Sequence, residues 1–169
     1  MARVLVAYAS KLGSTREIAR FIAGELSEAG HDAVAIAVRD VQSMSAYDAV
    51  ILGSALYAAH WQRDANRFVV RHRAALTALP LWLFSSGPLD RGFAVADLPI
   101  TPHAAEITGS LLARGHKTFG GRLAPDAEGV DPQVLATHAV GDFRPWPMIR
   151  GWCAEIARDL DALTDDTSR

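Results

Sequence analysis

The sequence has little cysteine, no excess of positive charge and no long apolar run. Its single cysteine, Cys153, cannot form an internal disulfide and excludes a zinc site built from cysteines. Seventeen basic side chains against nineteen acidic ones give a net charge of −2, whereas binding nucleic acid through its phosphates needs a basic excess. The apolar runs are far shorter than the ~20 residues that cross a bilayer. We therefore expect a cytoplasmic protein with no transmembrane segment and no nucleic-acid partner.

Histidine is present, but its spacing is not that of a metal site. The six histidines show no pattern such as His-x3-His, which would place two ligands on one turn of a helix. Only His60 falls in a segment that we place beside a ligand, where its imidazole could exchange protons with that ligand. Cys153 lies on the apolar face of the expected last helix, which favours a core position over a reactive thiol. We predict no metal site and no catalytic side chain.

Strand-like and helix-like segments alternate along the 169 residues. Apolar runs rich in β-formers predict strands, and apolar positions three or four residues apart predict helices. The expected strands are residues 4–8, 33–38, 48–54, 81–85 and 116–123, and the expected helices are residues 14–29, 65–79, 101–114 and 149–163. Thr101 with Pro102 is typical of a capped helix start. This alternation predicts an α/β protein with a parallel sheet and helices on both faces.

The composition indicates one domain. Half of the residues are hydrophobic and 21% are charged, the balance of a soluble domain with a sizeable core. We assign residues 1–163 to this domain and residues 164–169 to a polar tail. Residues 124–147 form the one long irregular segment, and loops of that length are usually functional or mobile.

The loop after the first expected strand has the features of a phosphate site. In an open α/β sheet, ligands bind beyond the carboxyl ends of the strands. Here the hydroxyls of Ser10, Ser14 and Thr15 surround a glycine just before a helix, whose N-terminus favours an anion. The alternative is a plain helix cap, because Ser14 and Glu17 fit a capping box. The spacings of a P-loop and of a dinucleotide-binding loop are missing, which leaves a single phosphate held by hydroxyls.

The loops after the third and fourth strands carry aromatic and small residues. Tyr57 and Trp61 follow the third strand, and Leu89 and Phe93 follow the fourth, so a flat ring could lie between them. The alternative for Tyr57 and Trp61 is packing at the end of a helix. Because both residues fall on the ligand side of the sheet, we favour contact of at least one of them with a ring.

Two stretches carry a pattern that extends beyond these loops. They are Tyr8-x-Ser10-x-x-Gly13-x-Thr15-Arg16-Glu17-Ile18-Ala19 and Val50-Ile51-Leu52-Gly53-Ser54-Ala55 followed by His60-Trp61. The chain resembles the flavodoxin-like family, which binds flavin mononucleotide (FMN), and within it the menaquinone-dependent protoporphyrinogen dehydrogenases and their uncharacterised flavodoxin-domain relatives. The resemblance implies a flavodoxin-like three-layer sandwich whose five-stranded parallel sheet has the order 2-1-3-4-5.

The resemblance also implies a set of FMN-binding residues. The phosphate would be held by Ser10, Lys11, Leu12, Gly13, Ser14 and Thr15, the isoalloxazine ring would be flanked by Tyr57, Ala58, Ala59, His60 and Trp61, and its other side would be lined by Ser86, Gly87, Pro88 and Leu89. The chain departs from electron-carrier flavodoxins, which have Thr-x-Thr-Gly-x-Thr in the first loop and a strongly acidic composition. It departs from the dehydrogenases in residues 123–147, which are acidic where those proteins carry a basic insertion.

Redox chemistry on bound FMN is the favoured function, with electrons or hydride passing to an unidentified redox partner or small-molecule substrate. A protoporphyrinogen-dehydrogenase-type oxidoreductase is the alternative, with residues 124–147 as a substrate lid. A flavin-free binding module with the same fold is the third hypothesis. The cluster Phe143-Arg144-Pro145-Trp146 could cover the edge of the flavin or form a homodimer contact.

Overall fold

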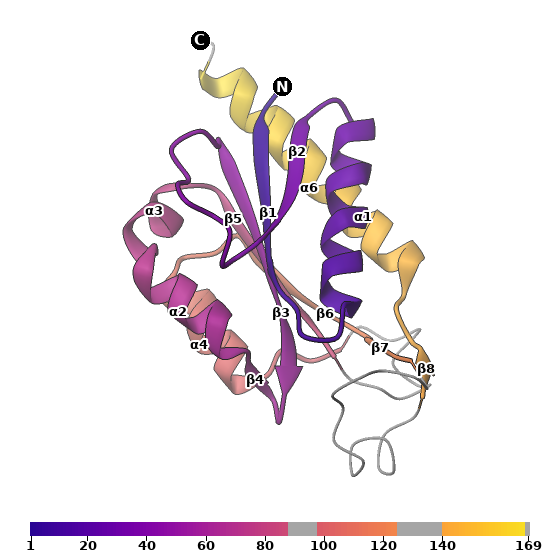
Figure 1. The fold of residues 1–169 in the computed structure, drawn as a ribbon. Coiled ribbons are helices and arrows are strands. Elements are labelled where there is room, and N and C mark those ends of the chain that lie inside the picture. The colour runs from indigo at the N-terminus through magenta and orange to yellow at the C-terminus, as the bar shows by residue number, and fades with distance from the viewer. Residues whose placement is uncertain (88–97, 125–139, 168–169) are drawn as a thin grey trace.

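A parallel sheet forms the centre of the protein (Figure 1). The structure is a computed structural model that describes residues 1–87, 98–124 and 140–167. The parallel strands are β1 (Arg3–Ala9), β2 (Asp32–Ala37), β3 (Ala49–Tyr57), β5 (Leu81–Ser86) and β6 (Gly115–Phe119). They lie in the order β2-β1-β3-β5-β6, and each neighbouring pair is parallel. Counted along the chain, this is the expected order 2-1-3-4-5, which is confirmed.

Helices cover both faces of the sheet, so the expected three layers are present (Figure 1). One face is covered by α1 (Ser14–Glu28) and α6 (Trp146–Thr167), and the other by α2 (Arg63–Arg71), α3 (Arg73–Ala78) and α4 (Pro102–Ser110). The predicted cap of α4 is confirmed, because the Thr101 hydroxyl accepts a hydrogen bond from the N–H of Ala104 at 3.3 Å. Within the described ranges, no helix is both long and apolar enough to cross a membrane.

Each face of the sheet has its own hydrophobic core. On one face, Ile18, Ile22 and Leu26 share a stripe of α1, because residues three or four apart lie on one side of a helix. They pack with Trp152 and its neighbours on α6. Cys153 belongs to this core at 2% exposure, as predicted, and burial raises the pKa of its thiol to about 12. The second core lies between the sheet and α2, α3 and α4.

Several element boundaries differ from the predicted ones. The helix expected over residues 65–79 is two helices, α2 and α3, which meet at His72. The fifth strand ends at Phe119, and the chain after it forms β7 (Arg122–Leu123), which pairs with β8 (Gly141–Asp142) outside the main sheet. The backbone of Phe143 passes directly against Gly120, where an added Cβ would lie 2.0 Å from the Phe143 carbonyl oxygen, so only glycine fits at this point after β6. The final helix runs to Thr167 and so includes residues assigned to the tail.

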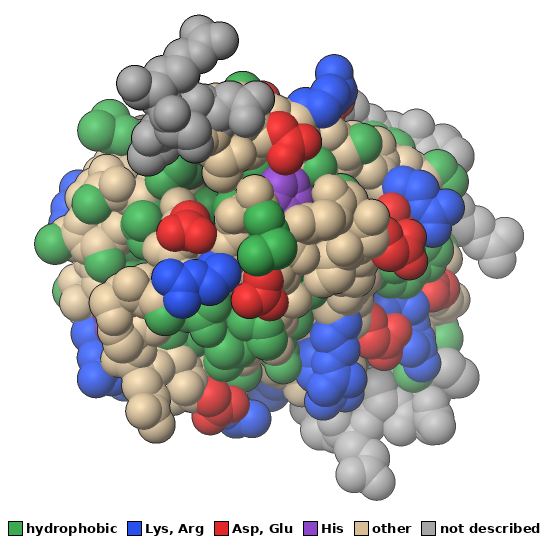
Figure 2. Space-filling model, turned by 90° about the horizontal axis from the view of Figure 1, so that it is seen from above, with side chains coloured by type: hydrophobic (Ala, Val, Ile, Leu, Met, Phe, Trp, Pro, Cys, Tyr) green, Lys and Arg blue, Asp and Glu red, His purple; other side chains and the backbone are tan. Residues whose placement is uncertain are grey.

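The end of the molecule at which the strands begin carries mixed charge. Figure 2 views this end, and acidic and basic side chains alternate there among hydrophobic ones. A surface of this kind attracts neither cations nor anions strongly.

Candidate functional site

A cavity of about 190 Å³ opens where β1, β3 and β5 end. We call it the edge cavity, and its lining residues are Ser10, Leu12, Ser14, Thr15, Ala55, Leu56, Tyr57, Ala58, Ser86, Gly87, Gly121, Arg122 and Leu123. They come from the β1–α1 loop and the start of α1, from the ends of β3 and β5 and the residues that follow them, and from β7 with the glycine before it. The structure therefore brings together residues from all three loops that the sequence analysis selected.

Two buried hydroxyl groups at the edge cavity have no hydrogen-bond partner in the described part of the chain. They are Thr15 Oγ1 and Ser86 Oγ. Both residues are 1% exposed. Leaving a buried polar group unpaired costs about 1–3 kcal/mol, so native proteins rarely do so without a ligand or water nearby. A polar group bound in the edge cavity would give these two hydroxyls the partners that the described residues do not supply.

The β1–α1 loop turns sharply at Gly13, which precedes α1 with φ at 90°. This left-handed conformation favours glycine. The Ser10 hydroxyl accepts a hydrogen bond from the Gly13 N–H at 3.1 Å, and the Ser14 hydroxyl accepts one from the Arg122 N–H at 3.0 Å. The capping-box interpretation of Ser14 is therefore wrong, since α1 has no side-chain cap among the described residues. The first N–H groups of a helix lack intrahelical acceptors and remain available to an anion.

The segment after the third strand is a hairpin instead of the expected loop. β3 continues to Tyr57 and pairs antiparallel with β4 (His60–Trp61). Ala58 and Ala59 make the turn with φ values of 47° and 65°, which are strained for residues other than glycine. Tyr57 lines the edge cavity and stays 44% exposed, while its partial burial raises the pKa of the phenol.

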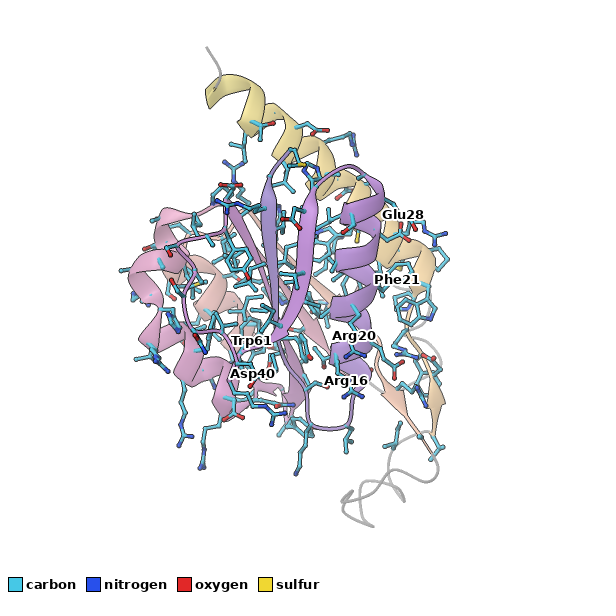
Figure 3. The ribbon with its side chains drawn as sticks, turned by 45° about the horizontal axis from the view of Figure 1, so that its top comes forward. Arg16, Arg20, Phe21, Glu28, Asp40 and Trp61 are labelled. Atoms are coloured by element: carbon cyan, nitrogen blue, oxygen red, sulfur yellow. The ribbon has the colours of Figure 1, made fainter. Side chains whose placement is uncertain are left out.

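Trp61 is buried instead of lining the edge cavity. Its side chain belongs to the core beneath α2 and lies on the opposite side of the sheet from Phe21 of α1 (Figure 3). The indole N–H donates to Ser85 Oγ at 2.8 Å, and Ser85 Oγ lies 2.9 Å from Nε2 of His116. Burial lowers the pKa of His116 to about 4, so this imidazole is neutral at pH 7. The three side chains tie the hairpin to β5 and β6.

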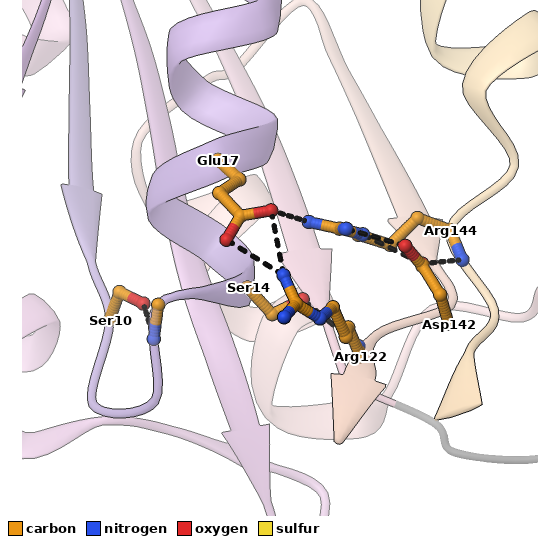
Figure 4. A network of polar contacts seen from close by, with 7 residues as sticks. Ser10, Ser14, Glu17, Arg122, Asp142 and Arg144 are labelled. Carbon is orange, nitrogen blue, oxygen red and sulfur yellow. Dashed lines mark hydrogen bonds and ion pairs between the residues drawn. The ribbon is translucent and has the colours of Figure 1, made fainter. Parts of the chain in front are cut away.

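A network of ion pairs fastens the β7–β8 pair to the start of α1 (Figure 4). The Arg144 guanidinium lies 2.5 Å from a carboxylate oxygen of Glu17 and 2.5 Å from one of Asp142. Arg122 reaches Glu17 at 3.1 Å. Partial burial of Glu17 opposes its ionisation, but Arg144 and Arg122 outweigh this and hold its pKa below the usual value. Hydrogen bonds from Arg144 also lower the pKa of Asp142. We call these four residues the clamp.

The aromatic cluster around Arg144 packs against this clamp residue and against α1. The guanidinium lies over the Trp146 ring at 4.6 Å, and that ring contacts Phe21 of α1 with 4.9 Å between centroids. Phe143 is 6% exposed. The cluster therefore packs within the protein and holds the chain after β6 beside the edge cavity. A homodimer stays a prediction.

The predicted site residues fall into four groups. Those that line the edge cavity are Ser10, Leu12, Ser14, Thr15, Tyr57, Ala58, Ser86 and Gly87. Lys11, Gly13 and Trp61 line neighbouring hollows, whereas Ala59 and His60 are exposed on the hairpin. The His60 imidazole lies 2.8 Å from the carbonyl oxygen of Ala58. Pro88, Leu89 and Phe93 fall outside the described residues, as do residues 125–139.

Sequence reasoning missed the wall of the cavity that follows β6. Gly121, Arg122 and Leu123 line it, but they were assigned to the fifth strand. The only signal was the Gly120-Gly121 pair, because adjacent glycines inside an expected strand indicate a close approach of two backbones. A Cβ on Gly121 would in fact lie 3.1 Å from the Cα of Gly87.

A family model described as "Flavodoxin domain" matches residues 5–126, more than two thirds of the chain. The chain belongs to the flavodoxin-domain family. Members of this family are FMN-binding redox proteins. The edge cavity suits part of such a cofactor, because among the described residues it combines two unpaired hydroxyls, an uncapped helix N-terminus and an aromatic side chain within a largely apolar lining.

Individual proteins that are similar to this chain are consistent with its membership of this family. Protoporphyrinogen IX dehydrogenase (quinone) of Escherichia coli strain K12 is 29% identical over 85 residues, which are 49% of this chain and 47% of the relative. The match thus spans about half the length of the curated relative. Rubredoxin oxygen:oxidoreductase from Desulfovibrio gigas superposes with a TM-score of 0.65 and 17% identity over 95% of this chain and 36% of that chain.

A cysteine-to-serine variant of the flavodoxin from Pseudomonas aeruginosa superposes with a TM-score of 0.60 and 20% identity, over 94% of this chain and 99% of that chain. At these identities the two solved structures establish a shared fold. The family membership itself rests on the match to residues 5–126.

Proposed function

We propose that FMN binds at the edge cavity and that the protein transfers electrons by means of the bound flavin. The observation that supports this most directly is a pair of hydroxyls, Thr15 Oγ1 and Ser86 Oγ, that have no partner among the described residues of a flavodoxin-domain chain. Each hydroxyl would gain a partner from a phosphate or sugar oxygen of FMN. A hydrogen bond to a phosphate oxygen contributes about 1.5–3 kcal/mol and one to a neutral sugar oxygen about 0.5–1.5 kcal/mol, so the two groups together would supply a substantial share of the binding free energy.

Each part of the edge cavity has a defined task in this proposal. The N–H groups at the start of α1 and the dipole of that helix attract the phosphate. Thr15 and Ser86 donate hydrogen bonds, and Tyr57 offers its ring face to the flavin. The apolar side chains of Leu56 and Leu123 exclude water from the polar groups and so strengthen their interactions. FMN, when bound, supplies the acceptance and release of one or two electrons.

The visible absorbance spectrum of the purified protein tests the proposal. After incubation with FMN and gel filtration, we expect flavin bands corresponding to nearly one FMN per chain. The double variant Thr15→Val with Ser86→Ala should lose most of this flavin, whereas Ser43→Ala should keep it. Ser43 is the matched control because its hydroxyl is exposed and lies in the β2–β3 loop. Wild-type protein that retains no flavin and shows no FMN affinity in a fluorescence titration would be a flavin-free binding module.

The Escherichia coli relative favours a second function, the oxidation of protoporphyrinogen IX with a quinone as acceptor. Its support is the 29% identity over 85 residues, which covers 47% of that protein. The test is to mix FMN-loaded protein with protoporphyrinogen IX and a quinone and to follow the fluorescence of the porphyrin formed. Turnover well above that of free FMN would indicate an enzyme. Equal rates for the FMN-loaded protein and free FMN would contradict this second function and leave electron transfer as the proposed function.

A further inference from the structure

Exposed cationic side chains surround the outer side of the β1–α1 loop and the start of α2. We call this group the basic surface, and its members are Lys11, Arg16, Arg39, Arg63, Arg67 and Arg71. The last three lie four residues apart in α2, so they share one side of that helix. Lys11 and Arg39 follow β1 and β2, which end beside each other in the sheet. The fold therefore gathers cations from the β1–α1 loop, α1, the chain after β2 and α2 at the edge that carries the candidate FMN site.

Open hollows connect the basic surface with the edge cavity. A hollow of about 580 Å³ is lined by Lys11, Arg39 and Arg63 together with Tyr57, and Tyr57 also lines the edge cavity. A second hollow of about 470 Å³ extends to Arg16 and Asp40, which lie at the same end of the sheet in Figure 3. A molecule bound on the basic surface would thus touch the tyrosine that borders the candidate flavin site.

The basic surface has the opposite charge to the chain as a whole. In the described residues, Asp40 and Asp64 are the carboxylates that line the same hollows, so the cations outnumber them by four, while the whole chain has a net charge of −2. Among the described residues, the ion pairs of these two carboxylates are long and exposed, Arg39–Asp40 at 3.9 Å and Arg67–Asp64 at 4.0 Å, and they neutralise little charge. A local excess of one sign steers molecules of the opposite sign toward it.

The form of the basic surface favours a protein partner over a small anion or a membrane. Its arginines extend for about 12 Å along α2, further than one carboxylate or phosphate group reaches. The apolar side of α2, including Phe68 and Val69, is buried against the sheet. Its exposed side offers Val70, at 77% exposure, as a large apolar residue, and a membrane would gain little from inserting it. Dispersed cations around a small apolar spot are typical of a protein–protein contact with an acidic partner.

We infer that the basic surface docks an acidic protein that exchanges electrons with the FMN-loaded chain. The redox part of this inference rests on the proposed function, whereas the docking part depends only on the charges and hollows. Docking there would place the partner against Tyr57 and so beside the flavin site. The acidic face of the partner would also be repelled by the acidic remainder of this chain, which fixes the side on which it binds.

Binding of fluorescein-labelled poly-L-glutamate, followed by fluorescence anisotropy, tests the docking. The key variant is Arg63→Glu with Arg71→Glu, and the matched control is Arg114→Glu with Arg158→Glu. All four arginines are exposed, both variants change the net charge equally, and the control residues lie beside the start of β6 and on α6. We expect the wild type and the control to bind the probe at low salt and the key variant to bind about tenfold more weakly. In the reduced, FMN-loaded protein, the probe should also slow reoxidation by ferricyanide several-fold.

Three results would overturn the inference. One is no binding of poly-L-glutamate at low salt. Another is an equal loss of binding in both variants, which would assign the effect to net charge. The third is tighter binding to vesicles of phosphatidylserine and phosphatidylcholine in equal parts, which would assign the surface to a membrane. Because anisotropy needs no flavin, a protein that binds the probe but not FMN would retain the docking surface and lose the proposed function.

Discussion

Removing the hydroxyl of Thr15 distinguishes a role in folding from a role in ligand binding. Because this buried group has no partner in the described chain, replacing it by the similarly shaped valine should not lower the free energy of unfolding and could raise it by about 1 kcal/mol. FMN affinity should nevertheless fall about tenfold, the equivalent of one lost hydrogen bond. Chemical denaturation of the cofactor-free protein and a flavin fluorescence titration measure the two effects.

Thr118→Val is the control for this substitution. Thr118, in β6, is buried as Thr15 is, but its hydroxyl donates a hydrogen bond to the carbonyl oxygen of Pro99 at 3.4 Å. Its replacement should lower stability and leave FMN affinity unchanged. Unchanged FMN affinity in Thr15→Val would show that this hydroxyl does not contact the cofactor.

Arg144 should be the most costly charged residue of the clamp to remove. Its side chain is 4% exposed, whereas its partners Glu17 and Asp142 are 40% and 44% exposed. An exposed pair contributes at most about 1 kcal/mol, and breaking a buried one costs about 3–5 kcal/mol. Because the carboxylates left behind can reach water, we expect Arg144→Gln to lower the free energy of unfolding by about 2 kcal/mol. Arg67→Gln, which breaks an exposed pair with Asp64, should cost less than half as much in the same denaturant titration.

The clamp also predicts how stability depends on pH. The pKa values of Glu17 and Asp142 are lowered in the folded protein from ordinary values of 4.5 and 3.8. A depressed carboxyl pKa stabilises the fold above the unfolded value, and this contribution is lost as the pH falls through the folded value. The melting temperature should therefore drop from about pH 5 downward, and the difference between wild type and Arg144→Gln should shrink over the same range. A constant difference would contradict this account.

At the scale of elements, the β3–β4 hairpin carries the clearest strain. Ala59 adopts a φ of 65° in the turn, a conformation that costs an alanine about 1 kcal/mol relative to glycine. We expect Ala59→Gly to raise the free energy of unfolding by about 0.5–1 kcal/mol, and the same exchange in α3, Ala74→Gly, to lower it by a similar amount. Thermal unfolding of both variants measures the contrast. Destabilisation by both would mean that the hairpin is not strained.

The sequence predicts the regular elements well and their interruptions poorly. The strands and α1 follow from periodicity, because burial on one or both faces imposes it. The hairpin was missed because Ala58-Ala59 lacks the glycine or asparagine that usually makes a two-residue turn. The role of Ser14 was also missed, since its partner is Arg122, more than a hundred residues away. Long-range pairing of this kind leaves no mark in local spacing.

At the scale of the whole molecule, the candidate site depends on segments that meet only in the folded chain. The β1–α1 loop and the ends of β3 and β5 are brought together by the strand order, which could be predicted from the alternation of elements. The remaining wall depends on Arg144, which joins β8 to α1 through Asp142 and Glu17. The sequence predicts neither that wall nor the clamp. Because the clamp holds this wall of the edge cavity in place, loss of the clamp should weaken FMN binding and lower the stability of the fold.

The uneven charge of the molecule should determine which electron acceptors it meets fastest. Ferricyanide is a multivalent anion, so its reaction with the dithionite-reduced, FMN-loaded protein reports the local electrostatic potential beside the candidate flavin site. Stopped-flow reoxidation should slow several-fold as ionic strength rises to ~0.15 M, where the Debye length is about 8 Å. The variant Arg63→Glu with Arg71→Glu should be slow and nearly insensitive to salt, and Arg114→Glu with Arg158→Glu should behave as wild type. A cationic acceptor such as hexaammineruthenium(III) should show the opposite trend, because the same cations repel it. Equal slowing in both variants would mean that total charge, and not the basic surface, governs the approach.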